Sequence, residues 1–404
     1  MSPDPHTVSV VIPALNEEAG ILDVVQRLRQ AADRIESAEP RVERVQILVV
    51  DDGSTDRTAE IAGSVSGVEV LSLPENRGYG GALKAGFEAA QGDLLAFLDA
   101  DGTYPPEFLS DLVASILGSG ADIILGSRMV GAGSRMPAVR RAGNLFFARL
   151  LSWITGRSIS DTASGMRIFR REVLGRLGRL PDGLDFTPAM STSALHERLD
   201  IREIPMPYDE RAGMSKLNPV TDGLRFLATI LRTAHRYNPL KFFGLIGLIL
   251  VAAGIGYGIG PLAYYLQVQR VEDWAIYRLV AVIVLLISGI NMIFFGVVAN
   301  VILAANYRVP PFRNSLLARI LLRPFVIRHL WILGGLLMIS ALVLNHEGLF
   351  SYLASGKVYA HWSYTLTGAL LWLLGLSLAL WGSLVRVVAP KAGPDRDPKA
   401  KKEP

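Results

Sequence analysis

The sequence contains no cysteine, which excludes disulfide bonds, thiolate zinc sites and a cysteine nucleophile. Its six histidines are scattered and form no HExxH motif, so zinc hydrolases of that class are excluded too. Charged residues make up 19% of the 404 positions, below the roughly 25% usual in soluble domains, and half of the residues are apolar. This composition fits a membrane protein.

The charges are unevenly distributed along the chain. Residues 1–240 hold 26 Lys and Arg against 31 Asp and Glu, a net charge of −5, whereas residues 241–404 hold 15 against 6, a net charge of +9. The positive excess lies among apolar segments and in the tail, where a membrane surface is the better partner. We therefore expect no nucleic-acid binding.

The second half contains four stretches without Asp, Glu, Lys or Arg: Phe242–Gln269, Leu279–Tyr307, His329–His346 and Val358–Val385. A helix needs about 20 mostly apolar residues to cross a bilayer. The third stretch is short, and it reaches that length by including Phe325–Ile327. Four such stretches in succession predict a four-helix membrane domain over 242–388, with a basic, disordered tail at 389–404, rather than buried helices of a soluble core.

Basic residues in the short loops predict the orientation of these spans. They cluster before the first span, between the second and third, and in the tail, whereas the other two loops hold only Arg270, Arg278 and Lys357. The even number of spans agrees with this distribution. We therefore expect the N-terminal domain and both termini to be cytoplasmic.

An amphipathic segment precedes the first span, at residues 218–241. Leu224, Leu227 and Leu231 recur at i, i+3 and i+7, and arginines such as Arg225 and Arg232 recur seven residues apart. This pattern predicts a helix lying in the membrane interface. An ordinary surface helix of the N-terminal domain is the alternative.

Strand-like and helix-like segments alternate over the first 125 residues. The expected strands are Val8–Ile12, Val45–Val50, Val68–Leu73, Leu94–Leu98 and Ile123–Leu125. The expected helices are Ala19–Ala32, Thr58–Gly63, Gly80–Ala90 and Phe108–Leu117. This alternation predicts a doubly wound α/β domain over 1–217, in which ligands bind beyond the carboxyl ends of the strands.

Polar motifs follow the expected strands at those ends. No GxGxxG follows the first strand, and Gly78-x-Gly80-Gly81 opens a later helix, so a nicotinamide or flavin enzyme is not expected.

Asp99-Ala100-Asp101 closes the fourth strand. Two carboxylates so spaced can bind one Mg²⁺ or Mn²⁺ together with substrate phosphate oxygens, and such an ion would neutralise a diphosphate leaving group. A simple turn or helix cap is the alternative role for these aspartates.

The ordered set of motifs resembles a known family. It comprises ValIleProAlaLeuAsnGlu, ValValAspAspGlySerThrAsp, AsnArgGlyTyrGlyGlyAlaLeu, LeuAspAlaAspGly, GlySerArg, AspThrAlaSerGlyMetArg and GluArgAlaGlyMetSerLys. Over residues 7–235 this set is similar to family 2 glycosyltransferases of the GT-A fold. More narrowly it resembles polyprenyl-phosphate glycosyltransferases, the group of dolichyl-phosphate mannose synthase and GtrB-like enzymes. The Gln-x-x-Arg-Trp motif of processive polysaccharide synthases is absent.

The resemblance implies roles for individual residues. Those implied to bind the nucleotide sugar are Pro13, Leu15, Glu17, Val50, Asp52, Asp99, Ala100, Asp101 and Thr103. Asp99 and Asp101 would also hold the metal. Those implied to bind the acceptor phosphate are Arg128, Arg140 or its neighbour Arg141, Arg211, Ser215 and Lys216. Catalysis would involve Asp99, Asp101, Arg128 and Asp161, the last as a general base if one exists, or only as a residue that orients the loop.

These observations predict transfer of one hexose from a UDP- or GDP-sugar to a polyprenyl phosphate, with inversion at the anomeric carbon. A phosphate acceptor is largely ionised near neutral pH, because its second pKa is about 6, and it needs no strong base. The chief alternative is a glycosyltransferase acting on a lipid hydroxyl, which would need one. A transporter with a regulatory head would carry ionisable residues inside its spans, and an inactive scaffold would not need Asp99 and Asp101. The resemblance also makes homo-oligomerisation through the spans an open expectation.

Overall fold

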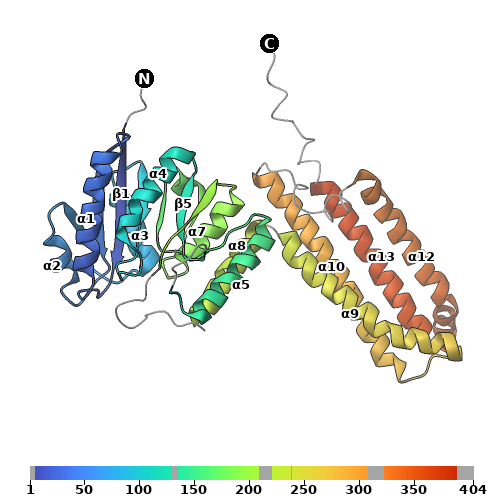
Figure 1. Ribbon diagram of the computed structural model, residues 1–404. Helices are drawn as coiled ribbons and strands as arrows, with labels where there is room; N and C mark the ends of the chain where they lie inside the picture. Colours follow the sequence, from blue (N-terminus) through green and yellow to red (C-terminus); the bar gives the residue numbers. More distant parts are fainter. Residues whose placement is uncertain (1–4, 130–134, 209–220, 238, 308–322, 389–404) are drawn as a thin grey trace, which may run out of the picture. The chain divides into compact units, whose positions relative to one another are not determined.

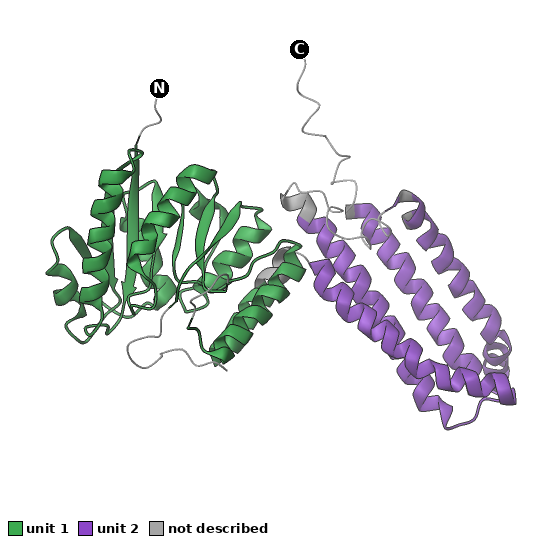
Figure 2. Ribbon diagram, in the orientation of Figure 1, with its two compact units in different colours: residues 1–234 green, residues 235–404 purple. Residues whose placement is uncertain are grey.

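The computed structural model describes the whole chain except residues 1–4, 130–134, 209–220, 238, 308–322 and 389–404. It divides into two compact units, Met1–Ala234 and His235–Pro404, which are described separately (Figure 2). The division falls inside the segment 218–241 that was expected to form an interfacial helix.

Unit 1 is built on one seven-stranded sheet in the order β3-β2-β1-β4-β6-β5-β7. Figure 1 labels the strands β1 and β5 of this sheet and the helices around it. The strands are β1 His6–Ala14, β2 Val42–Asp51, β3 Val68–Ser72, β4 Leu94–Phe97, β5 Ile123–Ser127, β6 Arg167–Arg170 and β7 Ile201–Pro205. The helices are α1 Ile21–Ala38, α2 Thr58–Gly63, α3 Tyr79–Ala89, α4 Leu109–Ser119, α5 Ala138–Thr155, α6 Val173–Arg176, α7 Phe186–His196 and α8 Thr221–Tyr237, with a short 3₁₀ turn η1 at Pro106–Phe108.

Alternating side chains of the central strands form two cores, one on each face of the sheet. In β1, Val8, Val10 and Ile12 pack with α1 and α4, whereas Val11 packs with α3 and α7 on the opposite face. Both sets are fully buried. Successive residues of a strand point to opposite faces, so a run of apolar residues is what a strand covered by helices on both sides requires.

The antiparallel strand β6 decides where the site lies. It pairs with β4 on one side and β5 on the other, while the remaining pairs are parallel. Because β6 runs the opposite way, the loop before it reaches the edge of the sheet at which β4 and β5 end. Residues far apart in the sequence, such as Asp99, Arg128 and Asp161, thereby come to one place.

The described residues of unit 2 form four helices long and apolar enough to cross a membrane: α9 Pro239–Val268, α10 Ala275–Tyr307, α12 Pro324–Ser355 and α13 Trp362–Val388. The stretch that looked short in the sequence belongs to α12, which includes Phe325–Ile327 and also continues past Glu347. α9 packs along α10, and α12 packs along α13. The four predicted apolar helices are therefore present, arranged in two hairpins.

Candidate active site

A cavity of about 560 Å³ opens in unit 1 beyond the carboxyl ends of β1, β2, β4 and β5. The loop before β6 and the helices α5 and α8 supply its other walls. Among the residues predicted to bind the nucleotide sugar, seven line it: Pro13, Leu15, Glu17, Asp52, Asp99, Ala100 and Asp101.

The other two predicted nucleotide-sugar residues lie elsewhere. Val50 is fully buried in the core, where its side chain fills the space beside Gly86 of α3. Thr103 is also buried, and its hydroxyl donates to Asp101 Oδ1 at 2.6 Å. Thr103 thus contacts a cavity-lining carboxylate rather than the cavity itself.

Asp99 and Asp101 are held in place by hydroxyl groups. The Tyr79 hydroxyl donates to Asp99 Oδ1 at 2.7 Å, as Thr103 does to Asp101. Hydrogen bonds of this kind orient carboxylates for metal binding. Within the described residues no group of three or more His, Cys, Asp or Glu could hold a metal. Two carboxylates are the donor set of an ion such as Mg²⁺, which takes one or two protein carboxylates and completes its shell with substrate phosphate oxygens.

Two glycine segments shape the surroundings of Asp99. Gly165, in the loop before β6, lies so close to the Asp99 carboxylate that a Cβ atom would collide with it, and the Gly165 N–H donates to the Tyr104 hydroxyl at 2.7 Å. Gly78 has φ +83°, a conformation that L side chains rarely adopt, and it precedes Tyr79 at the start of α3. The Gly78-x-Gly80-Gly81 stretch, weak as a dinucleotide signal, therefore places Tyr79 against Asp99.

Burial changes the electrostatics of Asp52 at the end of β2. Removal from water raises the pKa of its carboxyl group, an effect that the hydrogen bond from the Arg77 N–H, at 2.7 Å, only partly offsets. Asp52 is 3% exposed and lines the cavity. A carboxyl group placed there can accept a hydrogen bond from a nucleobase N–H, the contact that the resemblance implies for it.

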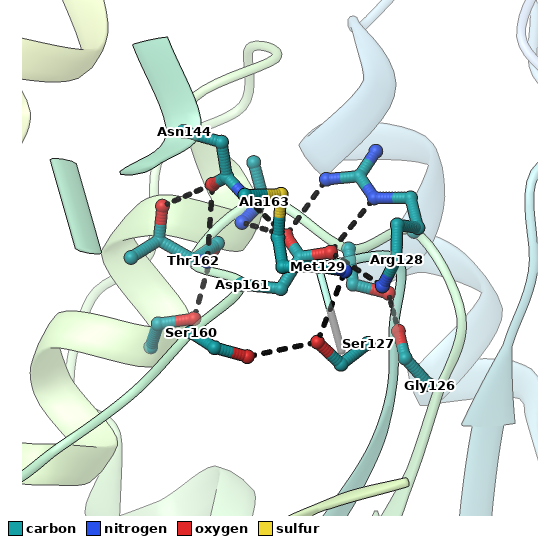
Figure 3. Close-up of polar contacts among 12 residues, drawn as sticks. Gly126, Ser127, Arg128, Met129, Asn144, Ser160, Asp161, Thr162 and Ala163 are labelled. Carbon is teal, nitrogen blue, oxygen red and sulfur yellow. Dashed lines mark hydrogen bonds and ion pairs between the residues drawn. The ribbon is translucent and has the colours of Figure 1, made fainter. Parts of the chain in front are cut away.

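Arg128 and Asp161 form a buried ion pair beside the cavity (Figure 3). Arg128 Nε donates to Asp161 Oδ2 at 2.8 Å and Nη2 donates to Oδ1 at 2.7 Å, the bidentate geometry of a strong pair. The aromatic rings of Tyr104 and Tyr208 lie 5.9 and 5.4 Å from the guanidinium carbon. Arg128, Tyr104 and Tyr208 all line the cavity, whereas Asp161 stands behind Arg128.

Asp161 is held as a carboxylate. Burial alone would raise its pKa, but the charge and hydrogen bonds of Arg128 hold the pKa below its usual range. Asn144 also donates to Asp161 Oδ1, at 3.0 Å. A carboxylate with a lowered pKa and this many donors is a poor proton acceptor. The geometry therefore favours the orienting role over the general-base role for Asp161.

Two residues of this network were not singled out from the sequence. Asn144, on α5, accepts hydrogen bonds from the N–H and hydroxyl of Thr162 at 3.3 and 3.1 Å. Arg167, on β6, is 1% exposed and donates to the carbonyls of Thr162 and Ser164, each at 3.0 Å. Burial lowers the pKa of Arg167 to about 10. Arg167 ends the AspThrAlaSerGlyMetArg motif, which was the available signal for it; Asn144 had none.

The predicted acceptor-phosphate residues are only partly described. Arg140 lines the cavity from α5, whereas its neighbour Arg141 is exposed and is not among the lining residues. Arg211, Ser215 and Lys216 lie outside the described residues. Of the two arginines between which the sequence left a choice, Arg140 is the one at the cavity.

Beside Arg140 and Asn144, the helices α5 and α8 contribute an apolar part of the cavity wall. It carries Met136, Val139 and Phe147 on or just before α5, and Gly223 and Phe226 on α8. The rings of Phe147 and Phe226 meet edge to face, with centroids 6.2 Å apart. One cavity thus joins a carboxylate pair, two arginines and an apolar wall.

Comparisons with known proteins show the family to which the chain belongs. The profile of glycosyl transferase family 2 matches residues 9–178, and that of a domain of unknown function matches residues 239–396. The chain is 34% identical over 264 residues to the low-salt glycan biosynthesis hexosyltransferase Agl6 of Haloferax volcanii, covering 62% of this chain and 61% of that protein. It therefore matches about three-fifths of that relative's length.

Two further relatives are matched over most of their length. A dolichyl-phosphate hexose transferase of Haloferax volcanii is 35% identical over 216 residues, covering 54% of this chain and 89% of the relative. An undecaprenyl-phosphate 4-deoxy-4-formamido-L-arabinose transferase of Aeromonas hydrophila subsp. hydrophila is 28% identical over 312 residues, covering 74% and 89%.

The chain belongs to glycosyl transferase family 2 and is a glycosyltransferase. The expected GT-A class is confirmed for the N-terminal domain, as a mixed sheet with helices on both faces, and four apolar helices follow it.

Proposed function

We propose that this glycosyltransferase moves one hexose from a nucleotide sugar to a polyprenyl phosphate, with inversion at the anomeric carbon. The observation that carries the proposal is the composition of the cavity, which joins Asp99 and Asp101 to the arginines Arg128 and Arg140 and to the apolar wall of α5 and α8. Two relatives whose names specify different polyprenyl phosphates support the acceptor class.

The donor would bind at the ends of β1, β2 and β4. Asp52 would accept from the base, and Asp99 and Asp101 would hold Mg²⁺ or Mn²⁺. When bound, such an ion neutralises the diphosphate as it leaves. Tyr79 and Thr103 would keep the two carboxylates turned toward the diphosphate through the hydrogen bonds described above.

The acceptor would approach from the apolar wall. Asp161 accepts one N–H each from Nε and Nη2 of Arg128, which leaves both N–H groups of Nη1 and the second N–H of Nη2 to bind an acceptor phosphate oxygen, and Arg140 lines the same cavity. The phosphate is already ionised near neutral pH, so it can attack the anomeric carbon without a protein base. This agrees with an Asp161 that serves to hold Arg128.

Product chemistry tests the proposal. Purified protein supplied with a radiolabelled UDP- or GDP-hexose, Mn²⁺ and undecaprenyl or dolichyl phosphate should give a lipid-extractable, mild-acid-labile product, and EDTA should abolish it. No such product with any common nucleotide sugar would contradict the proposal. An acid-resistant glycolipid formed from diacylglycerol would favour the hydroxyl-acceptor alternative instead.

A further inference from the structure

Within each hairpin of unit 2, the two helices approach each other at a pair of facing glycines. We call Gly247 and Gly334 the first-helix glycines, and their partners Gly289 and Gly375 the second-helix glycines. A Cβ atom on Gly247 of α9 would lie 2.5 Å from the carbonyl oxygen of Gly289 on α10, and one on Gly289 would lie 2.7 Å from that of Gly247. Gly334 of α12 and Gly375 of α13 face each other in the same reciprocal way, at 2.6 Å in both directions. Each pair allows two helix backbones to touch where any side chain would separate them.

A second close contact lies seven residues further along the second helix of each hairpin. A glycine follows seven residues after each of the second-helix glycines, Gly296 on α10 and Gly382 on α13. A Cβ on Gly296 would meet Leu240 and Phe243, and one on Gly382 would meet Trp331 and Leu330. Phe243 and Leu330 each stand four residues before the first-helix glycine of their own hairpin. One pair of equivalent positions therefore meets at this level in both hairpins.

A third contact joins equivalent positions in the two hairpins, but the glycine lies on the first helix in one hairpin and on the second helix in the other. In the first hairpin Gly258 of α9 packs on Val282 of α10, and in the second Gly368 of α13 packs on Asn345 of α12. Gly258 and Asn345 are each 11 residues after the first-helix glycine, and Val282 and Gly368 are each seven residues before the second-helix glycine. Three matching levels in one register are more than a general preference for small residues in membrane helices provides.

One pair of equivalent residues in the two hairpins is also in contact, and two further side chains pack beside it. Asn291 and Ser377 both stand two residues after their second-helix glycine, and Asn291 Nδ2 donates to Ser377 Oγ at 3.3 Å. Trp381 Nε1 donates to Asn291 Oδ1 at 2.7 Å, and the Trp381 ring stacks on Phe294. A contact between the same position on two copies is the mark of a twofold, self-complementary interface.

We infer that unit 2 is an internal duplication, in which two copies of one helical hairpin bind each other around an approximate twofold axis through α10 and α13. The seam, meaning Asn291, Phe294, Ser377 and Trp381, is thus a self-association surface whose partner is the second copy within the same chain. The chain therefore fills this surface by itself and needs no second molecule for it. The inference does not depend on the reaction proposed above.

An exchange of equivalent residues tests the twofold relation. Phe295 and Trp381 each stand six residues after their second-helix glycine and are therefore equivalent. The fourfold variant Asn291→Ser, Ser377→Asn, Phe295→Trp and Trp381→Phe exchanges the residues at both pairs of equivalent positions between the two hairpins. We expect Asn291→Ser with Trp381→Phe alone to lower the melting temperature in detergent by about 2–4 °C. The fourfold exchange should recover at least half of that loss. No recovery would overturn the twofold relation.

Disulfide trapping tests the seam even if the exchanged variant fails to fold. The chain has no cysteine, so introduced pairs have no background. With a protease site inserted between residues 307 and 323, oxidised membranes of Asn291→Cys/Ser377→Cys should keep the cleaved halves joined until reduction. Asn291→Cys alone should give no dimer. The matched control is the pair Asn291→Cys/Asn345→Cys, whose cysteines lie on the two different fragments but at different levels of the helices, and it should leave the halves separate. A disulfide-linked dimer from Asn291→Cys alone would show that the seam forms between chains and would overturn the inference.

Discussion

The Arg128 side chain is 11% exposed, and its guanidinium forms an ion pair with the carboxylate of Asp161, which is fully buried. Taking both charges out of water is costly, and the pair is stable only while both partners remain. Its value to the protein is therefore geometric: Asp161 fixes the plane of Arg128 at the edge of the cavity. Tyr104 and Tyr208 confine the same group from other directions.

Removing the charge of Asp161 should separate this role from that of a base. Asp161→Asn leaves Arg128 buried without its counter-charge, and we expect a loss of about 3–5 kcal/mol in the free energy of unfolding, measured by urea titration. Adding Arg128→Gln should restore most of the stability but not the activity. If Asp161→Asn unfolded like the wild type yet lacked all activity, Asp161 would be acting as a base instead.

The ion pair of Arg128 and Asp161 should also make the free energy of unfolding depend on pH in the acid range. Because the pKa of Asp161 is lowered in the folded protein, the unfolded chain takes up the proton first as the pH falls below about 4, the ordinary Asp value. The stability that the pair contributes is thus present above that pH and is lost as the pH falls toward the native pKa. The stability difference between wild type and Asp161→Asn should therefore shrink below pH 4. A difference independent of pH would contradict this linkage.

Among the elements, the expected strands and helices of the first 125 residues are all present. The central strands β1 and β2 are long apolar runs that helices cover on both faces of the sheet. β6 was not predicted: it has only four residues, and two of them are arginines. α7 was missed because ten of its residues are buried on all sides, which removes the one-sided pattern of an amphipathic helix. The site was predicted from strand ends, so Asn144, in the middle of α5, gave no signal.

The elements around Asp99 yield a prediction about the metal. Tyr79→Phe removes the hydroxyl that α3 presents to Asp99, and Gly165→Ala places a methyl group from the loop before β6 against the same carboxylate. Both should weaken Mn²⁺ binding in the presence of UDP or GDP, by roughly 10-fold or more. The readout is the electron paramagnetic resonance signal of free Mn²⁺ at each total concentration.

Matched substitutions control for general damage. Tyr359 is 76% exposed and lies outside unit 1, and Gly175 of α6 has open space where a Cβ would stand. Tyr359→Phe and Gly175→Ala should bind Mn²⁺ like the wild type. Unchanged Mn²⁺ affinity in both Tyr79→Phe and Gly165→Ala would remove these elements from any role at the metal.

At the scale of the whole molecule, the distribution of basic residues predicts which side of the membrane each end occupies. A fluorescent-protein fusion at Pro404 should be bright and a phosphatase fusion there inactive, because basic loops remain in the cytoplasm. A fusion after Gln269, in the loop between α9 and α10, should behave in the opposite way. An active phosphatase at Pro404 would reverse the predicted topology.

The position of β6 between β4 and β5 also determines when the sheet can be completed during synthesis of the chain. Until residues 167–170 have been synthesised, β5 has no strand through which to join the sheet, and β4 keeps one apolar edge unpaired. Exposed edges of this kind are open to pairing with other chains. The N-terminal domain therefore exposes an edge open to pairing with other chains until β6, which follows the loop that carries Asp161, takes its place in the sheet.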